Sequence, residues 1–152
     1  MNICIDTIHT DDHHMSMRGD EVTYVTHQLL DPTLNPKQLG AYGEQYAAMW
    51  LQRRGYRILD RNWQTRYGEI DVVAMSPEGT LLFVEVKTRR SALYGVPQEA
   101  VTSHKRLRLR RASVQWLLAP EHRIAHNGVR FDVIAIIVRD GRVQLRYIPE
   151  AF

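Results

Sequence analysis

The stretch that most constrains the fold lies at residues 68–87, where two apolar runs flank a turn and carry charges inside them. The sequence SPEG at 76–79 is typical of a turn, so the two runs predict a β-hairpin. Because side chains of a strand alternate between its faces, Glu85 and Lys87 should share one side, about 7 Å apart along the strand. If Glu69, Asp71 and Val73 point to that side too, the hairpin brings two carboxylates and an ammonium onto one face.

The opposite face of the hairpin is predicted to be apolar and buried, and it comprises Ile70, Val72, Ala74, Leu82, Val84 and Val86. Charges inside such a strand pair cost several kcal/mol unless they are paired or bound to a metal. Two explanations are open at this point. One is a catalytic or metal-binding cluster. The other is an ion pair of Lys87 with Asp71 or Glu85 on a solvated face, which contributes roughly 0.2–1 kcal/mol.

Composition indicates one domain with an uneven charge distribution. The chain has 152 residues and a net charge of +3, and this length suits one domain with an ordinary core. Residues 1–36 carry one basic and six acidic residues, a net −5, whereas residues 37–152 carry 19 basic and 11 acidic residues, a net +8. A basic body favours a polyanionic partner, most often nucleic acid, and a well-solvated cationic surface is the alternative.

Several features predict a cytoplasmic protein without a membrane segment. The single cysteine, Cys4, excludes an internal disulfide and suits a reducing compartment. No apolar stretch is long enough to span a bilayer. The beginning of the chain, MNICIDTIHTDD, lacks the basic start and the continuous apolar run of a signal peptide.

Residues 1–36 are expected to form a flexible N-terminal extension ahead of a domain at residues 37–152. They show no sustained hydrophobic period, and they end in DPTLNP at 31–36, a segment rich in turn residues. A short strand at 22–26 is the one element predicted here. Four of the seven histidines lie in this extension, but their spacing does not favour a metal site.

The body is expected to begin with a helix over residues 37–54. The Asn-Pro pair at 35–36 suits the N-cap and the first helical position, and Gly55 suits the end. Glycine and alanine at 40, 43, 47 and 48 make one side thin enough for close packing against a sheet. Glu44 lies on this side. It either belongs to a site or is a flank residue that is solvated or paired with an arginine.

The remaining pattern predicts an α/β protein in which helices flank a mixed sheet, in the order α-β-β-β-α-β-β. Strands are predicted at residues 56–63, 129–138 and 142–148. The second of these is apolar enough to be buried on both faces, and the third alternates as an edge strand does. A long helix over residues 98–118 ends before Pro120, and its inner stripe should consist of Val101, Lys105, Leu109, Ala112 and Trp116.

Three carboxylates, from Glu44, Asp71 and Glu85, can converge where the first helix crosses the charged face of the hairpin. Hard oxygen ligands of this kind favour Mg²⁺ or Mn²⁺, which retain water ligands and accept phosphate oxygens. The backbone carbonyl of Val86 is a further candidate ligand. Lys87 would orient or deprotonate the attacking water, or neutralise the phosphate in the transition state. Metal-dependent phosphodiester cleavage is the chemistry that fits this set.

Basic residues that follow the hairpin favour this interpretation over a structural ion pair. They occur in the loop after Lys87 and along the second predicted helix. Both segments can flank a nucleic-acid backbone, whose phosphates attract such side chains. The candidate nucleic-acid contacts are Arg89, Arg90, Lys105, Arg106 and Arg108.

An aspartate followed after fourteen residues by Glu-Val-Lys, with a glutamate on a preceding helix, resembles the PD-(D/E)XK nuclease superfamily. Ile70 stands where the superfamily pattern has proline. A wider pattern resembles the YraN family of bacterial proteins across residues 37–152, and it comprises Gly40-x-x-Gly43-Glu44-x-x-Ala47, Gly55-Tyr56, Arg61-Asn62, Gly68-Glu69-Ile70-Asp71, Phe83-Val84-Glu85-Val86-Lys87-x-Arg89, Gly95-x-Pro97-x-Glu99-Ala100-Val101, Lys105, Arg130-Phe131-Asp132 and Ala151-Phe152. Residues 1–36 have no counterpart in this pattern.

The resemblance implies a restriction-endonuclease-like or resolvase-like fold, with metal ligands at Glu44, Asp71 and Glu85 and the catalytic lysine at Lys87. It implies an endonuclease that uses Mg²⁺ or Mn²⁺ and acts on DNA, including branched DNA. By analogy with junction resolvases, it also suggests a homodimer, formed through strand 142–148 or the second helix. Two alternatives remain: a nucleic-acid-binding module without turnover on the same fold, and a protein-interaction scaffold. Asp132 matches the pattern as well and is expected to be structural.

Overall fold

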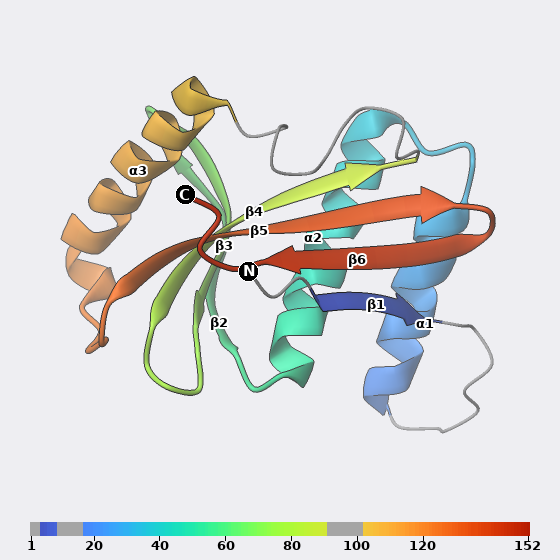
Figure 1. Ribbon diagram of the computed structural model, residues 1–152, viewed down its shortest axis with the longest axis horizontal. Coiled ribbons are helices and arrows are strands. Elements are labelled where there is room, and N and C mark those ends of the chain that lie inside the picture. The colour runs from blue at the N-terminus through green and yellow to red at the C-terminus, as the bar shows by residue number, and fades with distance from the viewer. Residues whose placement is uncertain (1–3, 9–16, 91–101) are drawn as a thin grey trace.

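A six-stranded mixed sheet forms the centre of the protein (Figure 1). The computed structural model describes residues 4–8, 17–90 and 102–152. The strands are β1 (Cys4–Ile8), β2 (Arg57–Thr65), β3 (Gly68–Met75), β4 (Leu81–Arg89), β5 (Val129–Arg139) and β6 (Arg142–Ile148). They lie in the order β1-β6-β5-β4-β3-β2, and β4 with β5 is the one parallel pair in the described sheet.

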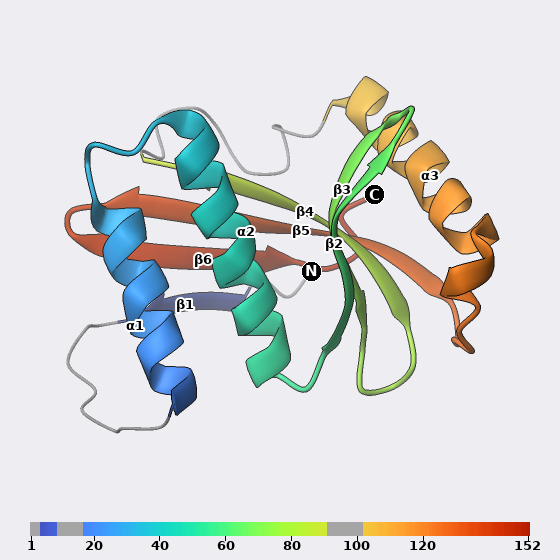
Figure 2. The same cartoon turned by 180° about the vertical axis from the view of Figure 1, so that it is seen from behind.

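Helices cover the two faces of this sheet unequally (Figures 1 and 2). Helices α1 (Met17–Leu30) and α2 (Pro36–Arg53) lie side by side on one face. Helix α3 (Ser103–Leu118) lies on the other face, over the end formed by β2 and β3, and a 3₁₀ turn at Pro120–His122 follows it. From α2 onward, the predicted α/β class and the order α-β-β-β-α-β-β are confirmed.

Two apolar clusters hold the layers together. The larger one joins α1 and α2 to β3–β6, and Leu51, Val84 and Ile136 are fully buried in it. The smaller one joins α3 to β3 and β4, and its centre is Trp116 against Phe83, with ring centroids 5.7 Å apart. Leu109, Ala112 and Trp116 thus form the predicted inner stripe of α3, whereas residues 98–101 of the predicted helix lie outside the described residues. None of the described helices is both long and apolar enough to cross a membrane.

The N-terminal region differs from its prediction. Residues 22–26, expected to form a strand, lie within α1, and α1 packs against α2. Val25 and Leu29 have no exposed surface. The predicted flexible extension therefore does not describe residues 17–36. The apolar residues Val22, Val25 and Leu29 recur at a helical spacing, and the β-branched members of this set suggested a strand instead.

Strand β6 was predicted to be an edge strand, and this prediction is wrong. β6 pairs with β5 on one side and with β1 on the other, both antiparallel. The alternation of β6 instead reflects one face packed on α1 and α2 and one face that no described helix covers. A homodimer through a free edge of β6 is therefore not available in this arrangement, because β1 occupies that edge.

Helix α2 begins and packs as its sequence predicts. The Asn35 side chain accepts a hydrogen bond from the Gln38 amide at 2.8 Å, and the Gln38 side chain accepts one from the Asn35 amide at 3.0 Å. Gly43 lies directly against Thr88 of β4, where a Cβ atom on Gly43 would come within 1.8 Å of Thr88 Oγ1. This absence of a side chain lets α2 approach the sheet and brings Glu44, the next residue, beside β3 and β4.

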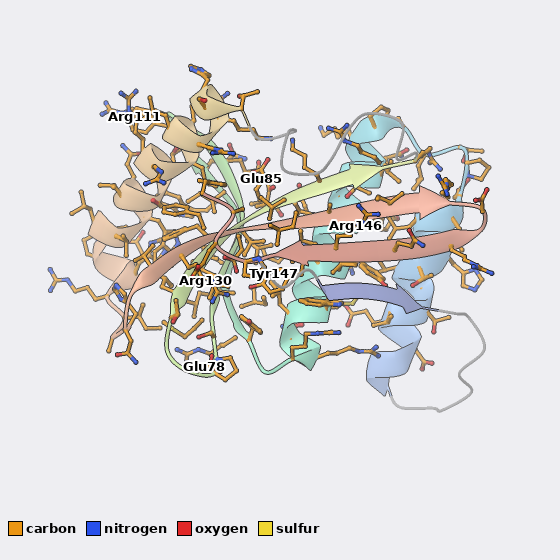
Figure 3. All side chains as sticks on the ribbon, viewed as in Figure 1. Glu78, Glu85, Arg111, Arg130, Arg146 and Tyr147 are labelled. Carbon is orange, nitrogen blue, oxygen red and sulfur yellow. The ribbon has the colours of Figure 1, made fainter. Side chains whose placement is uncertain are left out.

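A buried carboxylate fastens the C-terminal tail to the sheet. Asp132 on β5 has no exposed surface and accepts two hydrogen bonds from Arg130, at 2.9 Å each, to its two oxygens. It also accepts hydrogen bonds from the Tyr147 hydroxyl and, at 2.9 Å, from the Glu150 amide. Arg130 and Tyr147 lie together in Figure 3. These contacts give Asp132 the structural position that was expected for it.

We predict that Asp132→Ala lowers the free energy of unfolding by about 3 kcal/mol, because the guanidinium of Arg130 and the hydroxyl of Tyr147 lose their common acceptor. Urea unfolding followed by circular dichroism measures this change. The exposed residue Glu121 offers a control, since Glu121→Ala should change stability by no more than about 0.5 kcal/mol. Equal stability of the two variants would contradict the assigned role of Asp132.

Candidate active site

A cleft opens where β3 separates from β4. The two strands are paired from Met75 with Leu81 to Val72 with Val84, and the pairing does not continue to Asp71. A buried backbone amide normally needs a partner. The amide of Val86 on β4 donates to Asp71 Oδ2 at 2.8 Å, so a side chain takes the place of the strand backbone.

Strand β3 also turns as it leaves β4. Ile70 was predicted on the same face as Val72 and Ala74, but it packs with Val73 and Phe83 in the cluster beneath α3. That detail of the predicted pattern is wrong, because the strict alternation of a paired strand does not hold where the pairing ends.

The resulting cleft has a volume of about 370 Å³ and lies between α2, α3 and the diverging strands. Figure 3 shows Glu85 on β4 at the side that faces α3. All four predicted catalytic residues line the cleft. The complete lining is Glu44, Tyr67, Gly68, Glu69, Asp71, Glu85, Val86, Lys87, Lys105, Arg108, Leu109 and Ala112.

Three carboxylates from two elements converge on one side of the cleft. Glu44 comes from α2, and Glu69 and Asp71 come from β3. One oxygen of each lies within 4.8 Å of the others. Two of these residues were predicted to meet, whereas Glu69 was not included in the predicted ligand set. Its position two residues before Asp71, on the same side of a strand, is the signal that could have identified it.

Asn62 on β2 connects two of these carboxylates. Its Nδ2 donates to Glu44 Oε2 at 2.5 Å and to Glu69 Oε1 at 2.9 Å. The backbone φ of Asn62 is +50°, in the left-handed region that asparagine tolerates better than most residues. Sequence reasoning noted Asn62 only as part of the family pattern, and its amide reduces the repulsion between two carboxylates held side by side.

Two lysines lie against Glu85, whose carboxyl group is also next to that of Asp71. The carboxylate of Glu85 is buried and forms an ion pair with Lys87 on the same strand, with 3.4 Å between Nζ and Oε1. It also forms an ion pair with Lys105 of α3. Lys105 was predicted to contact nucleic acid, and in this structure its ammonium is bound to Glu85.

Burial of the acidic side favours protonated carboxyl groups. Burial raises the pKa of Asp71 to about 8, and the negative charge of Glu85 acts in the same direction. The hydrogen bond from the Val86 amide opposes this shift but does not cancel it. The pKa of Glu44 is also raised, mainly by burial, against the hydrogen bond from Asn62.

The two lysines are shifted in opposite directions. Burial lowers the pKa of Lys87, and a hydrogen bond with Lys105 lowers it further, against the attraction of Glu85. For Lys105 burial also acts to lower the pKa, but hydrogen bonds to Glu85 and Lys87 outweigh it, so the pKa of Lys105 is raised. Of the pair, Lys87 is therefore the residue that more readily gives up its proton.

The predicted nucleic-acid contacts lie in different surroundings. Arg108 lines the cleft, and its Nε donates to the Tyr67 carbonyl at 2.8 Å. Arg106 lies on α3 with its guanidinium 5.5 Å from the ring centroid of Phe152. Arg90 donates to the Asp31 carbonyl at 2.8 Å and so ties the end of β4 to the connection between α1 and α2. Contact of these residues with phosphate stays a prediction.

The donor set fits a hard divalent cation. Glu44, Glu69 and Asp71 offer carboxylate oxygens alone, and Mg²⁺ and Mn²⁺ prefer such ligands. A cation there would also balance Glu44 and Asp71, whose pKa values are raised chiefly by burial. Val86 lines the same cleft, so its carbonyl remains a candidate ligand.

The fold and the site define a class of protein: a mixed α/β domain with a carboxylate cleft at a point of strand divergence and lysines at its rim. The model of an uncharacterised protein family, UPF0102, matches residues 43–136. The chain therefore belongs to UPF0102, the family that the sequence pattern identified as YraN.

Curated relatives agree with this assignment. A UPF0102 protein of Bifidobacterium longum is 54% identical over 122 residues, which cover 80% of this chain and 98% of the relative. UPF0102 proteins of Rhodococcus opacus and Trichlorobacter lovleyi are 46% and 45% identical, each over 115 residues, which cover 75% of this chain and 95% and 89% of the relatives. The names of these relatives state no activity.

We predict that Asp71→Asn stabilises the metal-free protein at alkaline pH. Between pH 4 and pH 8 the folded Asp71 holds a proton that the unfolded chain releases, so the wild type loses stability as pH rises through this range. An amide mimics the protonated carboxyl and removes this loss. Thermal unfolding in EDTA at pH 5 and pH 8 should show that the gain of Asp71→Asn over the wild type is larger at pH 8 than at pH 5, by at least about 1 kcal/mol.

The matched control is Asp140→Asn, which removes the same charge from an exposed turn residue. This variant should follow the wild-type dependence on pH. If Asp71→Asn follows it as well, the carboxyl of Asp71 is ionised in the folded protein and the assigned pKa shift is wrong.

Proposed function

We propose that the protein is a divalent-metal-dependent endonuclease that hydrolyses phosphodiester bonds in DNA. The observation that carries the proposal is the convergence of Glu44, Glu69 and Asp71 in a cleft that Lys87 and Lys105 also line. Carboxylates and lysines that line one cleft suit a reaction in which a cation and an attacking water meet at a phosphate.

Glu44, Glu69 and Asp71 would hold Mg²⁺ or Mn²⁺, with Glu85 and the Val86 carbonyl as neighbouring donors. When bound, the cation withdraws charge from the phosphate and lowers the pKa of a coordinated water. Asn62 keeps two of the carboxylates at a fixed separation.

Lys87 and Lys105 have different roles in the proposed reaction. Lys87, with its lowered pKa, receives at Nζ the proton that the attacking water gives up. Lys105 keeps its charge and stabilises the additional negative charge of the phosphate in the transition state. Their common contact with Glu85 holds both amino groups at the cleft, Lys87 as the neutral base and Lys105 as the ammonium ion.

The choice of DNA rests on the basic surroundings of the cleft and on the family resemblance. Arg108 lies in the cleft wall, and its planar guanidinium suits phosphate recognition. Branched DNA, a homodimeric assembly and a cytoplasmic location remain proposals that follow from the resemblance and from the composition.

We predict that the wild type cleaves members of a panel of linear, flapped and four-way-junction DNA in Mg²⁺ or Mn²⁺ and not in EDTA. Asp71→Asn and Lys87→Ala should each lower the rate by about 10²-fold or more, because each removes a group that acts in the transition state. Denaturing gels of end-labelled DNA measure this. Asp71→Asn should also weaken Mn²⁺ binding in calorimetry.

Glu78→Gln is the matched control, because Glu78 lies in the exposed turn at the far end of the same hairpin (Figure 3). It should retain wild-type activity. Full activity of Asp71→Asn or Lys87→Ala would remove the proposed mechanism. Salt-sensitive DNA binding without cleavage in any divalent ion would identify a nucleic-acid-binding module instead.

A further inference from the structure

The face of β4, β5 and β6 that carries no described helix is strongly cationic. On each of these strands alternate residues pack toward α1 and α2, as Val86, Ile136 and Leu145 do, and the intervening residues face the other way. Among the charged residues at those intervening positions one is acidic, Glu85, and five are basic: Lys87, Arg89, Arg139, Arg142 and Arg146. The single acidic residue is already bound by Lys87 and Lys105.

Arg146 lies in line with the cleft. The register places Lys87 of β4 opposite Ala135 of β5, and Ala135 opposite Arg146 of β6. Two strand spacings separate Lys87 from Arg146, which is about 10 Å. The small side chain of Ala135 lies between the two long cationic ones. Figure 3 shows Arg146 over the strands, well away from α3.

The guanidinium of Arg146 has a hydrogen-bond donor without an acceptor within the described part of the chain. Its Nε is buried and has no hydrogen-bond partner there. A buried donor without an acceptor is costly, and an arginine that lacks a carboxylate suits a phosphate. Arg146 was not among the residues that the sequence suggested for nucleic-acid contact, because it was assigned to an edge strand and not to the face that continues the cleft.

We propose that the sugar–phosphate backbone of duplex DNA runs from the cleft across this cationic face, defined by Lys87, Arg89, Ala135 and Arg146. The proposal rests on the proposed function, since it extends the same site to the substrate segment beside the scissile phosphate. Charge complementarity selects the occupant: the two arginines, Arg89 and Arg146, beside Lys87 and a small apolar residue match a polyanion. The exposed residues Asp20 and Glu21 on α1, behind the sheet, make the opposite side less suited to such a ligand.

The test is DNA binding in EDTA, where no cleavage can occur. Fluorescence anisotropy with a fluorescein-labelled duplex and a labelled four-way junction compares the wild type with Arg146→Ala and Arg146→Gln. Both variants should bind about tenfold more weakly at 100 mM salt, and the slope of log affinity against log salt should fall by about 1. In Mg²⁺ the cleavage rate at saturating DNA should stay at the wild-type level, with a raised KM.

Arg53→Ala is the matched control, because it removes one exposed arginine at the end of α2, on the opposite side of the sheet. It should bind as the wild type does. If either Arg146 variant unfolds, Arg142→Ala tests the same face at an exposed position and should weaken binding about threefold.

The outcomes separate the two proposals. Wild-type binding by the Arg146 variants, together with weakened binding by Lys105→Ala, overturns the path across β5 and β6 and leaves the nuclease proposal standing. No DNA binding by the wild type, in EDTA or in Mg²⁺, overturns both. Equal weakening by Arg53→Ala and Arg146→Ala shows attraction by overall charge and also overturns the path.

Discussion

The site depends on one hydrogen bond, from the Val86 amide to the carboxylate of Asp71. A strand that leaves its neighbour exposes backbone amides, and a buried amide without an acceptor destabilises the fold. The Asp71 side chain supplies that acceptor to the Val86 amide at the point where β3 and β4 separate. The space between them becomes the cleft, and Glu44 enters it because Gly43 lets α2 lie against Thr88. Asp71 therefore both accepts a backbone hydrogen bond of β4 and contributes a carboxylate to the site.

The charges of the cleft are compensated unequally. Glu44, Glu69 and Asp71 lie close together, and burial, followed by the negative charges of Glu85 and Glu44, favours protonation at Asp71. Glu85, in contrast, is compensated by Lys87 and Lys105. A divalent cation on the acidic side would replace protons and complete the compensation, since metal binding competes with protonation for the same oxygens. The lysines would then remain available to the phosphate.

Much of the fold could be predicted from local patterns, because periodicity, caps and turns are local properties. The Asn35 cap, the hairpin and the buried strand β5 are examples. The wrong predictions concern features that depend on contacts between segments far apart in the sequence. β1 covers the edge of β6, and Val25 and Leu29 of α1 are buried. In the site, Glu44, Asp71, Glu85 and Lys87 were expected together. Glu69 was left out of the ligand set although its spacing from Asp71 placed both on one side of the strand, and the role of Asn62 was missed because it depends on how β2 bends toward Glu44 and Glu69.

The central claim is that the carboxylate cleft holds a divalent cation, and anomalous diffraction from crystals soaked in Mn²⁺ at pH 8 tests it most directly. We expect a strong anomalous peak among Glu44, Glu69 and Asp71, at ligand distances of about 2.0–2.2 Å. We also expect the peak to vanish in Asp71→Asn. The account would be contradicted by an empty cleft with Mn²⁺ bound elsewhere, or by carboxylates that keep their separation and exclude the ion.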